Sequence, residues 1–116
     1  MIQIEEPQIH LIAVRNIVDA VINPKLMVEV FNRTVKGLRA KTEVCAHSCW
    51  GNPSQQRMFA QVQSYKPALE AYNTVDADVI TFESSSSGGV DLEAIGKTIT
   101  DKKISVGVID HHTLQV

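Results

Sequence analysis

The fold is decided by residues 77–83, which read Ala-Asp-Val-Ile-Thr-Phe-Glu. Positions 79–82 are all apolar or β-branched, and such a run is typical of a strand that is buried in a parallel sheet. The run ends in the acidic residue Glu83, and the serines and glycines of residues 84–89 then predict a loop. The segment therefore predicts a buried strand that delivers a carboxylate to its carboxyl end.

On both sides of this strand, short β-branched runs alternate with stretches of helical periodicity. Strands are predicted at residues 1–5, 41–47, 77–83 and 103–109, and helices at residues 11–22, 25–39, about 58–69 and 92–98. Asn23 and Pro24 are typical of an N-cap and a first helical residue, and Asp91 is a candidate cap for the last helix. The alternation predicts an α/β fold built from βα units around a parallel sheet.

The composition is that of an ordinary globular protein, with 44% apolar and 21% charged residues. A length of 116 residues predicts a single domain over residues 1–116. The net charge of −2 provides no basic surface, so neither nucleic acid nor a membrane is expected as a partner. The N-terminus lacks the features of a secretory signal, and no apolar stretch approaches the ~18 residues of a membrane span, so we expect a cytoplasmic protein.

Chemically versatile side chains recur where the predicted strands end. Glu5 ends the first strand, His47 ends the second with Cys49 just beyond it, Glu83 ends the third, and His112 follows the fourth. In parallel α/β sheets the ligand site lies outside the carboxyl ends of the strands, where the loops converge. These residues therefore predict one shared site.

Three of these residues are suited to zinc. His47 and Cys49 are two positions apart, so on an extended segment an imidazole and a thiolate face the same side. The Glu83 carboxylate, from the neighbouring strand, would be a third ligand at ~2.0–2.2 Å and would leave a tetrahedral position open. An open position is typical of a catalytic zinc rather than a structural one.

Each of these signals has an alternative interpretation. An isolated His-X-Cys pair is a weak motif, and Glu83 could be a solvated loop carboxylate. Cys45 shares the side of His47, but a lone cysteine is more often a small buried residue than a ligand. The loop over residues 84–89 is either a flexible turn or an anion-binding loop that uses backbone N–H groups. His10 is expected at the surface.

Four segments, in chain order, resemble the catalytic barrel of the cobalamin-independent methionine synthase family. They are residues 2–7, 47–52, 78–83 and 107–112, so the resemblance spans essentially the whole chain. It implies a (β/α)8 TIM-type barrel, of which this chain would supply four consecutive βα units as a partial barrel without the final strand. It also implies zinc-dependent transfer of a methyl group to the thiol of homocysteine from a methyl-folate or related donor.

The resemblance assigns a role to each matching residue. His47, Cys49 and Glu83 match three zinc ligands, and Glu5 stands where the family has an aspartate that holds the amino group of homocysteine. His112 matches the family's proton donor. The family's fourth ligand, a cysteine on the final strand, has no counterpart in this chain, and a barrel of this type needs about 250 residues. A longer protein, a partner chain or a second copy is therefore expected to complete the barrel.

Two other functions stay open on the sequence alone. One is a non-catalytic barrel fragment that acts as an assembly module. The other is a corrinoid-linked thiol methyltransferase, which would take its methyl group from cobalt rather than from a folate.

Overall fold

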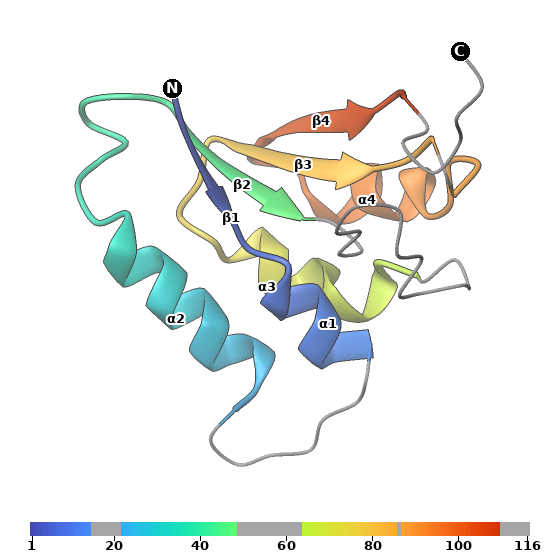
Figure 1. The fold of residues 1–116 in the computed structure, drawn as a ribbon, viewed down its shortest axis with the longest axis horizontal. Coiled ribbons are helices and arrows are strands. Elements are labelled where there is room, and N and C mark those ends of the chain that lie inside the picture. Colours follow the sequence, from blue (N-terminus) through green and yellow to red (C-terminus); the bar gives the residue numbers. More distant parts are fainter. Residues whose placement is uncertain (15–21, 49–63, 86, 110–116) are drawn as a thin grey trace.

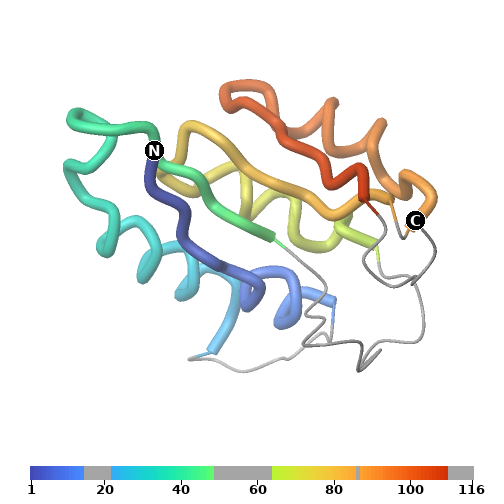
Figure 2. Tube along the Cα trace, turned by 45° about the horizontal axis from the view of Figure 1, so that its top comes forward, coloured from blue at the N-terminus to red at the C-terminus, as the bar shows by residue number. Residues whose placement is uncertain are grey.

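The computed structural model describes residues 1–14, 22–48, 64–85 and 87–109. Within these residues four strands form one parallel sheet in chain order: β1 (Ile2–Glu5), β2 (Val44–Ser48), β3 (Val79–Glu83) and β4 (Lys103–Gly107). Their carboxyl ends point the same way (Figure 1), and the strands lie side by side in sequence order (Figure 2). The predicted α/β class is confirmed, and the arrangement is that of a partial (β/α)8 barrel.

Helices connect the strands. They are α1 (Gln8–Val14), α2 (Pro24–Thr34), the 3-10 turn η1 (Lys66–Ala68), α3 (Leu69–Asn73) and α4 (Leu92–Thr98). None of the helices in these described ranges is long and apolar enough to cross a bilayer.

Helix α2 begins where the sequence predicts. The side chain of Asn23 accepts a hydrogen bond from the Leu26 N–H at 3.0 Å, and Pro24 occupies the first turn. The helix ends at Thr34, five residues before the predicted end, because residues 35–40 form turns. Gly37 adopts a φ of +79°, a left-handed conformation that glycine takes without steric cost.

Because of these turns, the second strand begins later in the sequence than predicted. The N–H groups of Lys41 and Thr42 both bond to the Leu38 carbonyl, so β2 starts at Val44 rather than at residue 41. The first helix begins at Gln8 rather than at residue 11. Of the helix predicted at about residues 58–69, only the last part lies in the described residues, where the chain forms η1 and α3.

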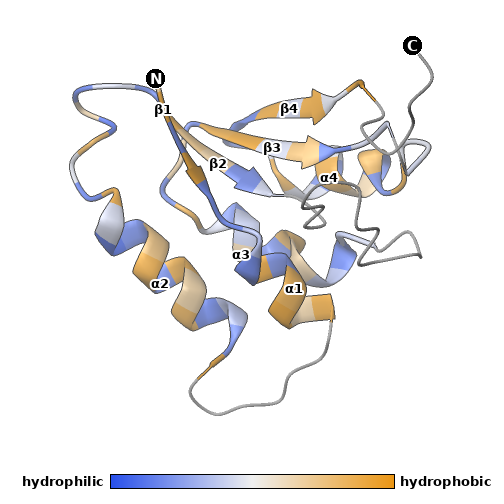
Figure 3. Cartoon of the chain, in the orientation of Figure 1, coloured by the Kyte–Doolittle hydropathy of each residue, from blue (hydrophilic) through white to orange (hydrophobic). Residues whose placement is uncertain are grey.

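The hydrophobic core lies between the sheet and its helices. Side chains from one face of β2 and β3 pack against α2, α3 and α4 in a single cluster that contains Val44, Ala46, Ile80, Phe82, Phe31, Tyr65, Tyr72 and Ile95. Since neighbouring strand residues point to opposite faces, the intervening positions of β2 and β3 face away from the helices. Strand β2 is apolar at its start and hydrophilic at its carboxyl end (Figure 3).

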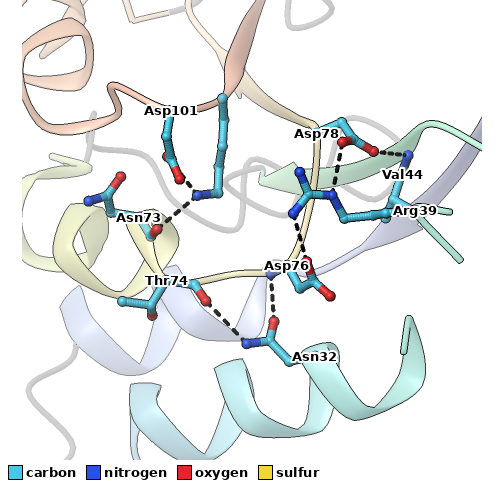
Figure 4. A network of polar contacts seen from close by, with 9 residues as sticks. Asn32, Arg39, Val44, Asn73, Thr74, Asp76, Asp78 and Asp101 are labelled. Atoms are coloured by element: carbon cyan, nitrogen blue, oxygen red, sulfur yellow. Dashed lines mark hydrogen bonds and ion pairs between the residues drawn. The ribbon is translucent and has the colours of Figure 1, made fainter. Parts of the chain in front are cut away.

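A network of hydrogen bonds and ion pairs links the segments at the amino ends of β2 and β3 (Figure 4). Arg39 reaches Asp76 at 2.7 Å and Asp78 at 2.9 Å. Asn32 bonds to the Thr74 carbonyl and to the Asp76 N–H, and so ties α2 to the segment before β3. In barrels of this type the amino end of the sheet serves stability, whereas the site lies at the carboxyl end.

The expectation that His10 lies at the surface is wrong. Its side chain is fully buried, because α1 packs against η1 and the segment before it. The ring centroid lies 4.7 Å from that of Tyr65, and Nε2 lies 3.1 Å from the carbonyl oxygen of Ser64.

The expectation that the Asp91 side chain caps α4 is also wrong. Its carboxylate makes no hydrogen bond to the helix. It instead accepts from the Ser64 hydroxyl at 2.6 Å and from the Tyr65 N–H at 2.8 Å, while the Asp91 backbone adopts a φ of 64°. The carboxylate therefore joins the start of α4 to the segment that leads into η1.

Candidate functional site

One row of polar side chains crosses the sheet near its carboxyl edge. The strand register pairs Glu5 with His47, His47 with Thr81, and Thr81 with Ser105. Glu83 lies two residues beyond Thr81 on β3, so it shares the same face. This face is the one opposite the helices, and it corresponds to the interior of a barrel.

His47 contacts both of its neighbours in this row. Its Nδ1 lies 2.6 Å from the Thr81 hydroxyl oxygen, and its Nε2 lies 3.6 Å from a carboxylate oxygen of Glu5. The His47 side chain is 30% exposed and the Glu5 side chain is 64% exposed. Glu5 also accepts a hydrogen bond from Gln3 at 2.8 Å.

Glu83 ends β3 in a buried position, with 9% of its surface exposed. Its N–H donates to the Tyr65 hydroxyl at 3.2 Å, which fixes the backbone at this point. In the register, Glu83 lies on the strand next to that of His47, and neighbouring strands are about 4.8 Å apart. Glu83 also lies two residues further along, which is roughly 6.5 Å in the strand direction. An imidazole and a carboxylate at that separation can reach a common ion.

Cys45 behaves as a buried residue of the sheet. It is 2% exposed and pairs with Gln3 and Val79 in the register. Burial raises the pKa of its thiol, and the charges of Glu43 and Glu5 raise it further. The low exposure and the position inside the sheet fit the interpretation of Cys45 as a small buried residue.

The residues after β3 form a compact turn. The Ser85 N–H donates to the Gly107 carbonyl, the Gly88 N–H to Ser85, and the Gly89 N–H to Ser84, at 2.9–3.2 Å. Gly88 and Gly89 both adopt positive φ, at 65° and 80°. Because these N–H groups bond within the protein, they favour the interpretation of this loop as a turn rather than an anion site.

The structure places part of the predicted site. His47, Glu83 and Glu5 lie on one face, whereas Cys49 and His112 fall outside the described residues. Over residues 1–14, 22–48, 64–85 and 87–109, no three His, Cys, Asp or Glu side chains are grouped closely enough to hold a metal ion. By donor type, the imidazole and carboxylate on adjoining strands fit two positions of a zinc site that a nearby thiolate would extend.

Sequence reasoning did not identify two neighbours of this site. Thr81 could have been noticed, since it lies two residues before Glu83 in the same strand and so faces the same side. Tyr65 carried no local signal, because its contact with Glu83 depends on how η1 packs under β3.

Comparison with known proteins points to one family. The family model described as "Cobalamin-independent synthase, Catalytic domain" matches residues 1–116. The 5-methyltetrahydropteroyltriglutamate–homocysteine methyltransferase of Halalkalibacterium halodurans is 30% identical over 116 residues, which are all of this chain and 14% of that protein. Proteins of the same name from Lactiplantibacillus plantarum and Bacillus velezensis are 31% and 30% identical over 74% and 76% of this chain, and over 10% of each relative. No solved structure matches significantly.

Proposed function

Because the chain belongs to the family of cobalamin-independent synthase catalytic domains, we propose that it is part of a zinc-dependent methyltransferase that transfers a methyl group to the thiol of homocysteine. The names of its relatives support this substrate class. The observation that carries the proposal is the position of His47 and Glu83. They share one face at the carboxyl ends of neighbouring strands, and Cys49 directly follows the end of β2.

In this proposal His47, Cys49 and Glu83 hold the zinc ion. Zinc deprotonates a coordinated thiol at neutral pH and so supplies the nucleophile. Cys49 and Glu83 bring two negative charges that balance the cation. The His47 side chain is 30% exposed, which leaves part of the residue accessible to a substrate.

The remaining site residues act on the substrate and the donor. The exposed Glu5 carboxylate, one strand from His47, is suited to hold the ammonium group of homocysteine. His112 is proposed to protonate the leaving amine, since a histidine changes charge near neutral pH. A methyl-folate is the proposed donor, and methyl-cobalamin is the alternative.

Zinc content of the 116-residue chain tests the metal site. We expect stoichiometric zinc in the wild type and a large loss in Cys49→Ser. Cys45→Ala is the matched control and should keep its zinc, because the Cys45 thiol is buried in the sheet, two residues before His47 and away from the carboxyl end of β2. Full zinc in Cys49→Ser, or none in the wild type, would overturn the assignment.

Methyl transfer tests the reaction. Homocysteine is supplied with methyl-folate or with methyl-cobalamin, and methionine is measured. Product from methyl-folate supports the leading proposal, and product from methyl-cobalamin alone supports a corrinoid-linked enzyme. Zinc binding without product from either donor supports an assembly module.

The outer edge of the sheet favours assembly with further chain. Every residue of β4 is exposed, including Ile104 at 37% and Val106 at 40%. Exposed apolar edge strands readily pair with other strands. We propose that a partner chain or a second copy covers this edge, and native mass spectrometry should then show a particle larger than the monomer. A well-folded, active monomer would contradict this.

A further inference from the structure

Within the part of the chain that the structure describes, Thr81 makes the closest side-chain contact with His47. The two residues are direct partners in the register of β2 and β3, and Thr81 Oγ1 lies 2.6 Å from His47 Nδ1. Both backbones belong to strands, and a β-branched threonine has restricted χ1 rotation. The position of the hydroxyl is therefore set by the sheet and not by a loop.

The two ring nitrogens of His47 are in different environments. Nδ1 is within hydrogen-bond distance of a hydroxyl, whereas Nε2 lies 3.6 Å from Glu5, which is too long for a hydrogen bond. If Nδ1 carries the proton and donates to Thr81, Nε2 keeps its lone pair. Glu5 would favour the opposite tautomer, with the proton on Nε2, because a carboxylate only accepts.

We infer that Thr81 is a positioning residue, which accepts a hydrogen bond from His47 Nδ1–H and so presents Nε2 as the metal-binding nitrogen. A histidine that ligates a metal usually donates its other N–H to a nearby oxygen acceptor, which fixes both the ring orientation and the tautomer. The inference rests on the proposed zinc site and adds a residue that does not itself touch the metal.

Two variants and one control test this role. Thr81→Val removes the hydroxyl but keeps the β-branched shape that suits a strand. Thr81→Ser keeps the hydroxyl and should restore wild-type behaviour. Thr34→Val is the matched control, because the Thr34 hydroxyl donates to the Val30 carbonyl on the exposed side of α2.

Zinc affinity of the full chain is measured by competition with a chromophoric chelator. We expect zinc to bind on the order of 10-fold more weakly to Thr81→Val, the lower end of the usual effect of such a partner. Thr81→Ser and Thr34→Val should match the wild type. Equal affinity in the wild type and Thr81→Val, or no rescue by Thr81→Ser, would overturn the inference.

The role of Thr81 can also be tested without metal, by measuring which ring nitrogen of His47 carries the proton. Long-range ¹H–¹⁵N spectra of the metal-free chain, with the signal assigned by its loss in His47→Gln, should show the proton on Nδ1. Thr81→Val should lose this preference. A proton on Nε2 in the wild type overturns the inference even if Thr81→Val fails to fold. A wild type that binds no zinc overturns the proposed function instead, and with it the metal-binding role of Nε2.

Discussion

Val44 and Asp78 exchange two hydrogen bonds at the amino ends of β2 and β3. The Asp78 N–H donates to the Val44 carbonyl at 2.8 Å, and the Val44 N–H donates to the Asp78 carboxylate at 2.9 Å. The same carboxylate accepts from Arg39 (Figure 4). One acidic side chain thus aligns the two strands whose opposite ends carry His47 and Glu83.

We expect Asp78→Ala to destabilise the fold more near neutral pH than in acid. The hydrogen bond from the Val44 N–H lowers the pKa of Asp78 below 3.8, and Arg39 contributes despite an opposing effect of burial. A carboxyl group with a depressed folded pKa adds stability above its unfolded pKa and loses it as the pH falls through the folded pKa. Urea unfolding of both proteins between about pH 5 and pH 2 should show their stability difference shrinking. A difference that stays constant with pH would contradict this mechanism.

The cap of α2 can be tested by two substitutions at one position. Asn23→Ala should lower the free energy of unfolding by about 1 kcal/mol, because the Leu26 N–H loses its acceptor. Asn23→Gly should cost only a few tenths of a kcal/mol, since glycine is tolerated at the N-cap. Thermal unfolding of the two variants checks the ranking, and equal losses would show that the side chain does not act as a cap.

The third strand and the start of α2 were predictable because their signals are local. The run at residues 79–82 and the Asn23–Pro24 pair each specify their own structure through side-chain shape or a nearby N–H. The segments that resemble the family also mark Glu5, His47 and Glu83 as site residues at the strand ends. The structure places these three side chains on one face.

Contacts between distant segments could not be predicted in this way. His10 is buried by a tyrosine 55 positions away, and nothing in its own helix indicates that partner. Asp91 stands where a cap belongs, but Ser64 and Tyr65 compete successfully for its carboxylate. The Thr81 contact depends on the register between β2 and β3, which no local pattern encodes.

The link between Asp91 and Ser64 is suited to a double-mutant cycle. Asp91→Gly removes the carboxylate without strain, because glycine readily adopts a φ of 64°. Together with Ser64→Ala it should show a coupling energy of about 0.5–3 kcal/mol in urea unfolding. A parallel cycle of Ser64→Ala with Glu93→Ala should give no coupling, since Glu93 pairs with Lys97. Equal coupling in both cycles would refute the direct bond.

Two buried tyrosines provide a matched test of how Glu83 is held. Tyr65 and Tyr72 are both fully buried and both meet the ring of Phe82 edge-on, with centroids 5.0 and 5.8 Å away. The Tyr65 hydroxyl accepts from the Glu83 N–H at 3.2 Å, whereas the Tyr72 hydroxyl donates to the Glu6 carbonyl at 3.0 Å. The Tyr65 hydroxyl therefore contacts the backbone of a proposed zinc ligand, whereas the Tyr72 hydroxyl contacts the backbone of Glu6.

We expect Tyr65→Phe and Tyr72→Phe each to lower stability by about 1–3 kcal/mol, because each removes one hydrogen-bond partner from a backbone group that is buried at Glu83 and partly buried at Glu6. Only Tyr65→Phe should also change the metal site, since it releases the backbone of Glu83. The absorption bands of the cobalt-substituted chain, which report ligand geometry, should shift in Tyr65→Phe and match the wild type in Tyr72→Phe. If both variants keep the wild-type spectrum, the Tyr65 hydroxyl stabilises the fold without holding the proposed ligand in place.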